Sequence, residues 1–170
     1  MARLSSIVFD VLLYGSIVAP YIVYAYAYKN PKNFTDFFTL DQFADMSIFA
    51  KGISCVLLLI AGIKSGFNKQ GVFYGIPLII LGQYLNSTVY KKLGKVRTYY
   101  GYEFGVVDLE MLTGFPFTFG HPQYKGSILT VLGGYFLVNN NSRITISCML
   151  WIVCYFFIIA VESTPHGMRP

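Results

Sequence analysis

Charged residues are scarce in this sequence. Only 12% of the 170 residues are Asp, Glu, Lys or Arg, against roughly a quarter in a soluble domain, whereas 55% are hydrophobic. So little charge excludes an ordinary water-exposed surface and favours a chain that lies in lipid. The net charge of +5 is small and dispersed, which excludes a nucleic-acid-binding protein because those gather basic residues on one face.

Cysteine is also scarce. Cys55, Cys148 and Cys154 each lie inside an apolar run, where a thiol behaves as a small hydrophobic side chain. Their spacing matches neither a metal site nor a disulfide framework. We therefore predict no metal site and assign the cysteines no chemistry.

Long apolar runs and aromatic residues are abundant instead. A helix needs about 20 apolar residues to cross the lipid core. Four segments meet this requirement with varying strength, and a shorter one of 13 residues suits a short or re-entrant helix that forms a hairpin with the last span through residues 139–143. The sequence thus predicts one all-α domain over residues 1–170, an integral membrane helical bundle with four spans and a short, re-entrant or fifth helix. The predicted spans are residues 7–28, 46–63, 72–90 and 144–161, and the short helix is 126–138.

Polar residues between the spans leave some choices open. Residues 29–45 mix Phe with polar residues, which suits an interfacial helix or a plain connecting loop. Asp10 and Lys51 lie near the starts of their spans, and ionisable groups in a span are candidate functional residues. The long stem of Lys51 also allows its ammonium to reach the lipid headgroups.

The largest basic cluster directly follows the third span and consists of Lys91, Lys92, Lys95 and Arg97. Positive charge marks the cytosolic or matrix side of a span. We therefore predict that this end faces the cytosol or matrix and that the N-terminus faces the opposite side.

Residues 101–127 carry the most specific pattern. The segment reads GYEFGVVDLEMLTGFPFTFGHPQYKGS and leads into the short apolar helix. It resembles the phosphatidylethanolamine and phospholipid N-methyltransferases, which carry Gly-Asp-Tyr-Phe-Gly, then Phe-Pro-Phe, then Asn-Pro-Met-Tyr-x-Gly-Ser. The resemblance extends from Ile80 to about Glu162. The matching positions are Gly101, Phe104, Gly105, Phe115, Pro116, Phe117, Pro122, Tyr124, Gly126 and Ser127.

This segment is the candidate site for a lipid headgroup. Pro116 and Pro122 prevent regular helix at the membrane surface. A hydroxyl and free N–H groups at the start of the next helix can receive a phosphodiester, although Ser127 could equally be a simple helix cap. The predicted headgroup residues are Pro122, Tyr124, Gly126 and Ser127 together with Lys91, Lys92, Lys95 and Arg97.

The resemblance also implies two motifs that hold S-adenosylmethionine. The Gly-x-Gly motif aligns with Ile80, Leu81 and Gly82, so that its first glycine is replaced. The Glu-Glu pair aligns with Val161 and Glu162, or with Glu162 and Ser163, and either register leaves one acid. Gly82 and Glu162 are thus the candidate cofactor-binding residues, and Glu162 is alternatively an acid at a helix end.

His121 occupies the position of the family asparagine. An imidazole there could accept the amine proton or donate to phosphate, or it could be a solvated loop residue. It is our one candidate for a catalytic residue.

Two functions follow from this resemblance. Because both donor motifs are degenerate, we interpret the chain as a structural or lipid-binding subunit of a larger membrane complex, with no bound cofactor. The alternative is an active phosphatidylethanolamine N-methyltransferase that uses S-adenosylmethionine. The expected partners are phospholipids and membrane proteins, which could dock on residues 29–45 and 92–125. The family's range implies the mitochondrial inner membrane or the endoplasmic reticulum.

Overall fold

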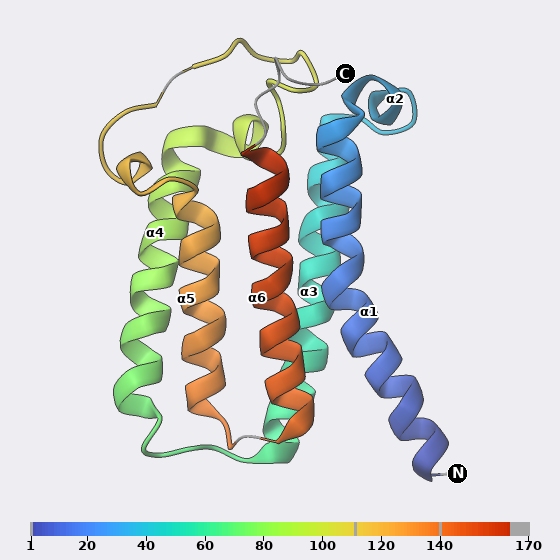
Figure 1. Cartoon of the computed structure of the whole chain (residues 1–170), viewed down its shortest axis with the longest axis vertical. Helices are drawn as coiled ribbons and strands as arrows, with labels where there is room; N and C mark the ends of the chain where they lie inside the picture. Colours follow the sequence, from blue (N-terminus) through green and yellow to red (C-terminus); the bar gives the residue numbers. More distant parts are fainter. Residues whose placement is uncertain (1, 111, 140, 164–170) are drawn as a thin grey trace.

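The computed structural model describes residues 2–110, 112–139 and 141–163, and these residues form helices without strands. This confirms the predicted all-α bundle (Figure 1). The elements are α1 (Ala2–Lys29), α2 (Pro31–Thr35), α3 (Leu40–Ser65), α4 (Val72–Thr98), a 3₁₀ turn (Phe117–Phe119), α5 (Pro122–Leu137) and α6 (Ser142–Glu162).

Four of these helices are long and apolar enough to cross a membrane, which confirms an integral membrane protein. Their outward faces carry large apolar side chains that water would not tolerate in such number, for example Phe73, which is 82% exposed, and Phe49, which is 71% exposed. The four spanning segments are Ser6–Lys29, Leu40–Ser65, Val72–Thr98 and Ser142–Glu162.

The second span begins earlier than its apolar run. The Thr39 hydroxyl accepts from the backbone N–H of Gln42, while the Gln42 side chain accepts from the backbone N–H of Thr39. This capping box starts α3 at Leu40 instead of residue 46. Residues 29–45 therefore contain one short helix, α2, followed by the first turns of α3.

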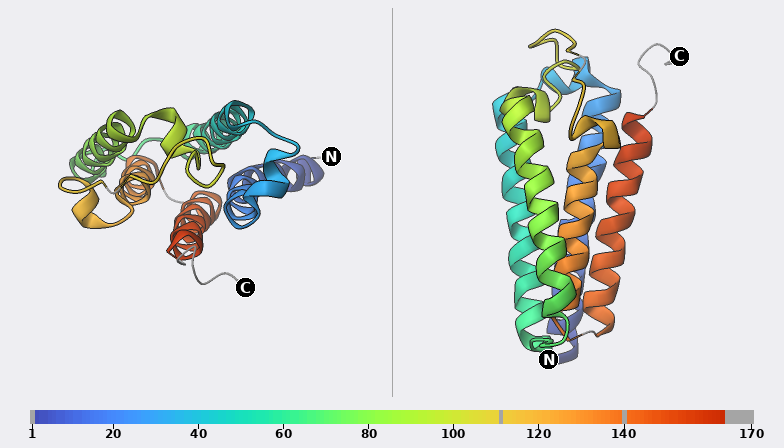
Figure 2. Two further views of the ribbon diagram at one scale, coloured as in Figure 1. Left: turned by 90° about the horizontal axis from the view of Figure 1, so that it is seen from above. Right: turned by 90° about the vertical axis from the view of Figure 1, so that its left-hand side faces the viewer.

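The helices alternate in direction, and α5 runs the full way from the loop end to the opposite end of the bundle (Figure 1). Viewed from above, α5 lies between α4 and α6, and α3 lies beside α1 (Figure 2). At the end away from the loop, the Asn68 N–H donates to Leu137 O at 3.0 Å and the Asn139 N–H donates to Gly66 O at 2.8 Å. These bonds join the α3–α4 turn to the α5–α6 turn.

Helices α4 and α5 pack at backbone contact. A Cβ on Gly82 would lie 2.4 Å from the Gly126 carbonyl oxygen, and a Cβ on Gly75 would lie 2.7 Å from the Gly133 carbonyl oxygen. Only glycine permits so close an approach, and small residues are typical of helix pairs in membranes. These four residues are called the glycine interface below. By contrast, α3 packs on α1 and α6 and has hardly any close contact with α4 or α5.

Candidate functional site

The predicted basic cluster is engaged within the protein. The Lys95 ammonium lies 2.8 Å from Asp41 and 3.3 Å from Asp45, both on α3. Arg97 pairs with Glu110 in the loop at 2.8 Å, and Lys92 donates to the Phe115 carbonyl oxygen. Lys91 and Lys92 are both exposed and form no ion pair among the described residues. The cluster therefore serves largely to fasten α4 to α3 and to the loop.

At the loop end, Glu162 collects side chains from three segments. The hydroxyls of Tyr100 and Tyr124 both donate to Glu162 Oε1, the first at 2.6 Å. The imidazole of His121 lies 3.9 Å from Glu162 Oε2, and its Nε2 is 3.1 Å from the Ser163 hydroxyl. Only 13% of the Glu162 side chain is exposed. Residues Tyr100, His121, Tyr124 and Glu162 are called the loop-end cluster below.

The chemistry of this cluster follows from its burial. Burial and the nearby Glu162 carboxylate raise the pKa of Tyr100 well above its usual value, so that the phenol stays protonated and donates. Burial and the neighbouring Lys125 lower the pKa of His121, so that its imidazole is neutral at pH 7. The cluster thus offers a carboxylate and a neutral imidazole at the membrane surface.

The residues that the resemblance assigns to S-adenosylmethionine, the methyl donor, do not lie together. The space beside Gly82, where a side chain would begin, is filled by the backbone of Gly126 on α5. No ligand can therefore approach Gly82 from that side. Ile80 points outward and is 64% exposed, while Val161 lies in the core and is 7% exposed. Glu162 belongs to the loop-end cluster. These positions do not fit the cradle for S-adenosylmethionine that the resemblance implies.

The predicted headgroup residues are also divided. Pro122 is buried as the first residue of α5, Tyr124 belongs to the loop-end cluster, and Gly126 contacts α4. Ser127 instead lies five residues into α5, so that it does not cap the helix, and its hydroxyl is 3.4 Å from the Asn86 side chain on α4.

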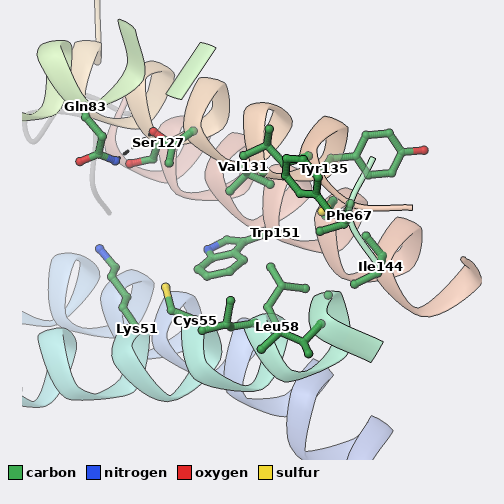
Figure 3. A pocket seen from close by; sticks show the side chains of 18 of the residues that line it. Lys51, Cys55, Leu58, Phe67, Gln83, Ser127, Val131, Tyr135, Ile144 and Trp151 are labelled. Atoms are coloured by element: carbon green, nitrogen blue, oxygen red, sulfur yellow. Dashed lines mark hydrogen bonds between the residues drawn. The ribbon is translucent and has the colours of Figure 1, made fainter. Parts of the chain in front are cut away.

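Ser127 faces a cavity of about 730 Å³ between α3, α4, α5 and α6 (Figure 3). Polar side chains line one end of this interhelical cavity, and apolar side chains such as Leu58, Val131 and Ile144 line the rest. Its volume lies within the ~300–1,000 Å³ of ligand sites. The polar lining residues are Lys51, Gln83, Asn86, Ser127 and Thr130.

A sequence model described as Phospholipid methyltransferase matches residues 71–167, which is more than half of the chain. The chain belongs to this family. The match covers α4, α5, α6 and the loop between them, and thus both the glycine interface and the loop-end cluster.

Three curated proteins are similar to this chain over part of their length. The chain is 38% identical over 91 residues to a phosphatidyl-N-methylethanolamine N-methyltransferase of Arabidopsis thaliana, covering 53% of this chain and 52% of that protein. It is 32% identical over 94 residues to phosphatidylethanolamine N-methyltransferase A of Dictyostelium discoideum, covering 54% and 41%. It is 45% identical over 60 residues to a phosphatidyl-N-methylethanolamine N-methyltransferase of Saccharomyces cerevisiae, covering 35% and 29%.

The matched segments thus cover about half or less of those relatives. No solved structure matches.

Sequence reasoning did not find Tyr100, Gln83, Asn86 or Trp151 as site residues. No local pattern marks them, because each reaches its site through contacts between segments that are far apart in the sequence. Tyr100 meets a residue 62 positions away, and Gln83 donates to Thr130, 47 positions away. Small residues seven apart on α4 and on α5 were a readable signal for the glycine interface.

Proposed function

We propose that this member of the phospholipid methyltransferase family binds a phospholipid in its interhelical cavity and does not transfer methyl groups. One contrast carries the proposal: the donor-side Gly82 is closed by helix packing, whereas the headgroup-side Ser127 faces an open cavity. The retained residues thus support lipid binding but not donor binding.

The cavity suits one acyl chain with part of a headgroup. Its apolar lining matches a hydrocarbon chain, and its polar end supplies amides and a hydroxyl for a phosphodiester. Ile63 and Phe67 at the other end are 71% and 60% exposed, so that this end is open to its surroundings. A second acyl chain could therefore remain outside in the bilayer.

The cellular setting is part of the same proposal. The chain serves as a structural, lipid-holding subunit of a larger membrane complex, in the mitochondrial inner membrane or the endoplasmic reticulum. Support comes from the small solvated surface, which leaves lipid and neighbouring membrane proteins as the main contacts of the chain. Purification under mild detergent should recover it in a stoichiometric complex, and purification as a free monomer would contradict this part.

A methyltransferase that acts on phosphatidylethanolamine or its partly methylated forms is the alternative. The loop-end cluster favours it, because a neutral His121 beside the Glu162 carboxylate could accept a proton from an amine. Family membership supports this kind of reaction if the chain is active.

One experiment separates the two functions. We expect the purified protein in lipid nanodiscs to show no calorimetric binding of S-adenosylmethionine and no transfer of labelled methyl to phosphatidylethanolamine. Native mass spectrometry of the same sample should detect a retained phospholipid. Micromolar binding with methyl transfer would overturn the non-catalytic proposal and establish the enzyme.

A variant that restores both family motifs sharpens this test. Val161 lies in the core, so that a second acid there would be buried at high cost, whereas Ser163 is exposed beside Glu162. The double variant Ile80→Gly with Ser163→Glu should therefore fold and restore both family motifs in the shifted register. Because Ile80 points outward, we expect this variant still not to bind S-adenosylmethionine. Recovery of binding would show that residue 80 or residue 163 contacts S-adenosylmethionine and would contradict our conclusion that these positions do not form a binding site for it.

A further inference from the structure

Lys51 places a positive charge inside the bundle. It lies on α3 six residues below Asp45, which is about 9 Å along the helix. Asp41 and Asp45 pair with Lys95 and mark the charged rim of the bundle, so that Lys51 lies beneath that rim. Its side chain borders the interhelical cavity and points across it toward Gln83 and Ser127 (Figure 3).

No acid neutralises this charge among the side chains that the structure describes. The Lys51 ammonium lies over the ring of Tyr24, 5.1 Å from its centroid. Glu162 attracts Lys51 at longer range, but its carboxylate is outside ion-pairing distance and is held by Tyr100 and Tyr124. This cation–π contact offsets only part of the cost of holding an ammonium group away from water, so that a further partner is required.

The other basic residues on α3 and α6 either pair with an acid or reach the surface. Arg143 at the opposite end of the bundle pairs with Asp10 and also donates to Ser6. Lys64 lies in the last turn of α3 and is exposed. Lys51 thus differs from both in facing an internal cavity without an acid.

We propose that Lys51 makes the cavity select lipids of net negative charge by pairing with the anionic group of the bound lipid. This rests on the proposed function, because it requires a lipid in the cavity. The neighbouring amides of Gln83 and Asn86 and the Ser127 hydroxyl can donate to the same anion. A zwitterionic headgroup carries its own cation and gains less from Lys51.

The cavity has room for the chain attached to that anion. From Lys51 to Ile63 the α3 wall extends about 18 Å, which exceeds the ~15 Å half-thickness of the hydrocarbon core. An anion at Lys51 therefore places its acyl chain along the apolar wall.

Trp151 gives a direct measurement, because it is the only tryptophan of the chain and it lines the cavity. We would titrate nanodiscs of unlabelled phosphatidylcholine with brominated phosphatidic acid or brominated phosphatidylcholine, whose bromines quench tryptophan on contact. Phosphatidic acid should half-quench Trp151 at a mole fraction roughly tenfold lower, as expected for a charge-assisted contact of about 1.5 kcal/mol. Lys51→Met should abolish this preference, Lys51→Arg should retain it, and Lys64→Met should leave it unchanged.

A second tryptophan position reports the surrounding bilayer. In the double variant Trp151→Phe with Phe156→Trp, the indole replaces a lipid-facing side chain that is 59% exposed. If neither lipid quenches Trp151 better than this reference, the cavity holds no lipid and the proposed function fails as well. If both lipids quench Trp151 equally and Lys51→Met changes nothing, the charge selectivity alone is wrong. Circular dichroism of each variant excludes unfolding as the cause, and an Arg variant that loses the preference despite a native spectrum would also overturn the inference.

Discussion

Helix α5 has two unlike faces, and two adjacent glycines show the difference. A Cβ on Gly133 would lie 2.6 Å from the Gly75 carbonyl oxygen, whereas a Cβ on Gly134 would meet nothing within 4 Å. The first residue belongs to the glycine interface with α4, and the second lines the interhelical cavity. One face is thus closed at backbone contact, and the next face is open to a ligand.

This contrast has a physical cause in the membrane. Lipid tails are as apolar as the side chains, so that helices associate through close packing and not through exclusion of water. Glycine provides that packing between α4 and α5. On the other face α3 stands away from α4 and α5, and the space between them needs another occupant. We therefore assign packing to the first face and lipid binding to the second.

The largest effect is expected from a substitution at residue 82, on the closely packed face between α4 and α5. Gly82→Ile should separate α4 from α5, because four carbons would enter a space where even one lies 2.4 Å from a backbone oxygen. The cost should reach at least the upper end of the ~1–3 kcal/mol of overpacking. Unfolding by denaturant in detergent measures it. Gly52→Ile on α3 is the matched control, because a Cβ there meets nothing within 4 Å. Equal losses in both variants would show that residue 82 is not at a close helix contact.

The sequence was sufficient for the main features of the fold. Apolar runs of about 20 residues predicted four spanning helices. Lipid offers no hydrogen-bond partners, so that the backbone of a spanning segment must bond within its own helix. The start of α3 was missed by six residues. Its capping box, Thr39 with Gln42, lies in a polar and aromatic stretch where hydropathy gives no signal.

The arrangement of the candidate site was harder to predict from the sequence, as Gly82 and Glu162 show. A missing Cβ admits a ligand or a second helix equally, so that sequence alone could not decide what approaches Gly82. Glu162 was identified as a functional candidate, but its partners Tyr100 and Tyr124 come from a loop and from another helix. For Lys51 the sequence left both a functional role and anchoring at the headgroups open, and in the structure its side chain lines the cavity.

A smaller change tests the two faces within one helical turn. Gly133→Ala should destabilise the protein by ~1–3 kcal/mol, because the added carbon meets the backbone of Gly75. Gly134→Ala should be neutral or stabilising by up to ~1 kcal/mol, because alanine is the better helix former and the space is free. Denaturant unfolding of both variants provides the comparison. A larger loss for Gly134→Ala would reverse our assignment of the faces.

A larger side chain at residue 134 separates stability from binding. Gly134→Leu should occupy part of the cavity and weaken lipid quenching of Trp151 roughly threefold, or by about 0.7 kcal/mol. The free energy of unfolding should change little, because the side chain enters open space. Gly52→Leu, on the outer face of α3, controls for added bulk. Unaltered quenching in a folded Gly134→Leu protein would place the lipid elsewhere.

The smallest change in lipid binding is expected at Thr130, which lies where the two faces of α5 meet. Its hydroxyl donates to the Gly126 carbonyl oxygen at 3.0 Å, accepts from Gln83 at 3.0 Å and borders the cavity. Thr130→Val keeps the volume but removes both bonds, so that we expect a loss of ~0.5–1.5 kcal/mol in unfolding free energy. Thr130→Ser keeps the hydroxyl and should lose less. Because Gln83 is exposed and can find other partners, the Val variant should also retain most of its lipid quenching. Loss of binding without loss of stability in Thr130→Val would instead mean that this hydroxyl contacts the lipid directly and that the polar end of the cavity extends further along α5 than Ser127.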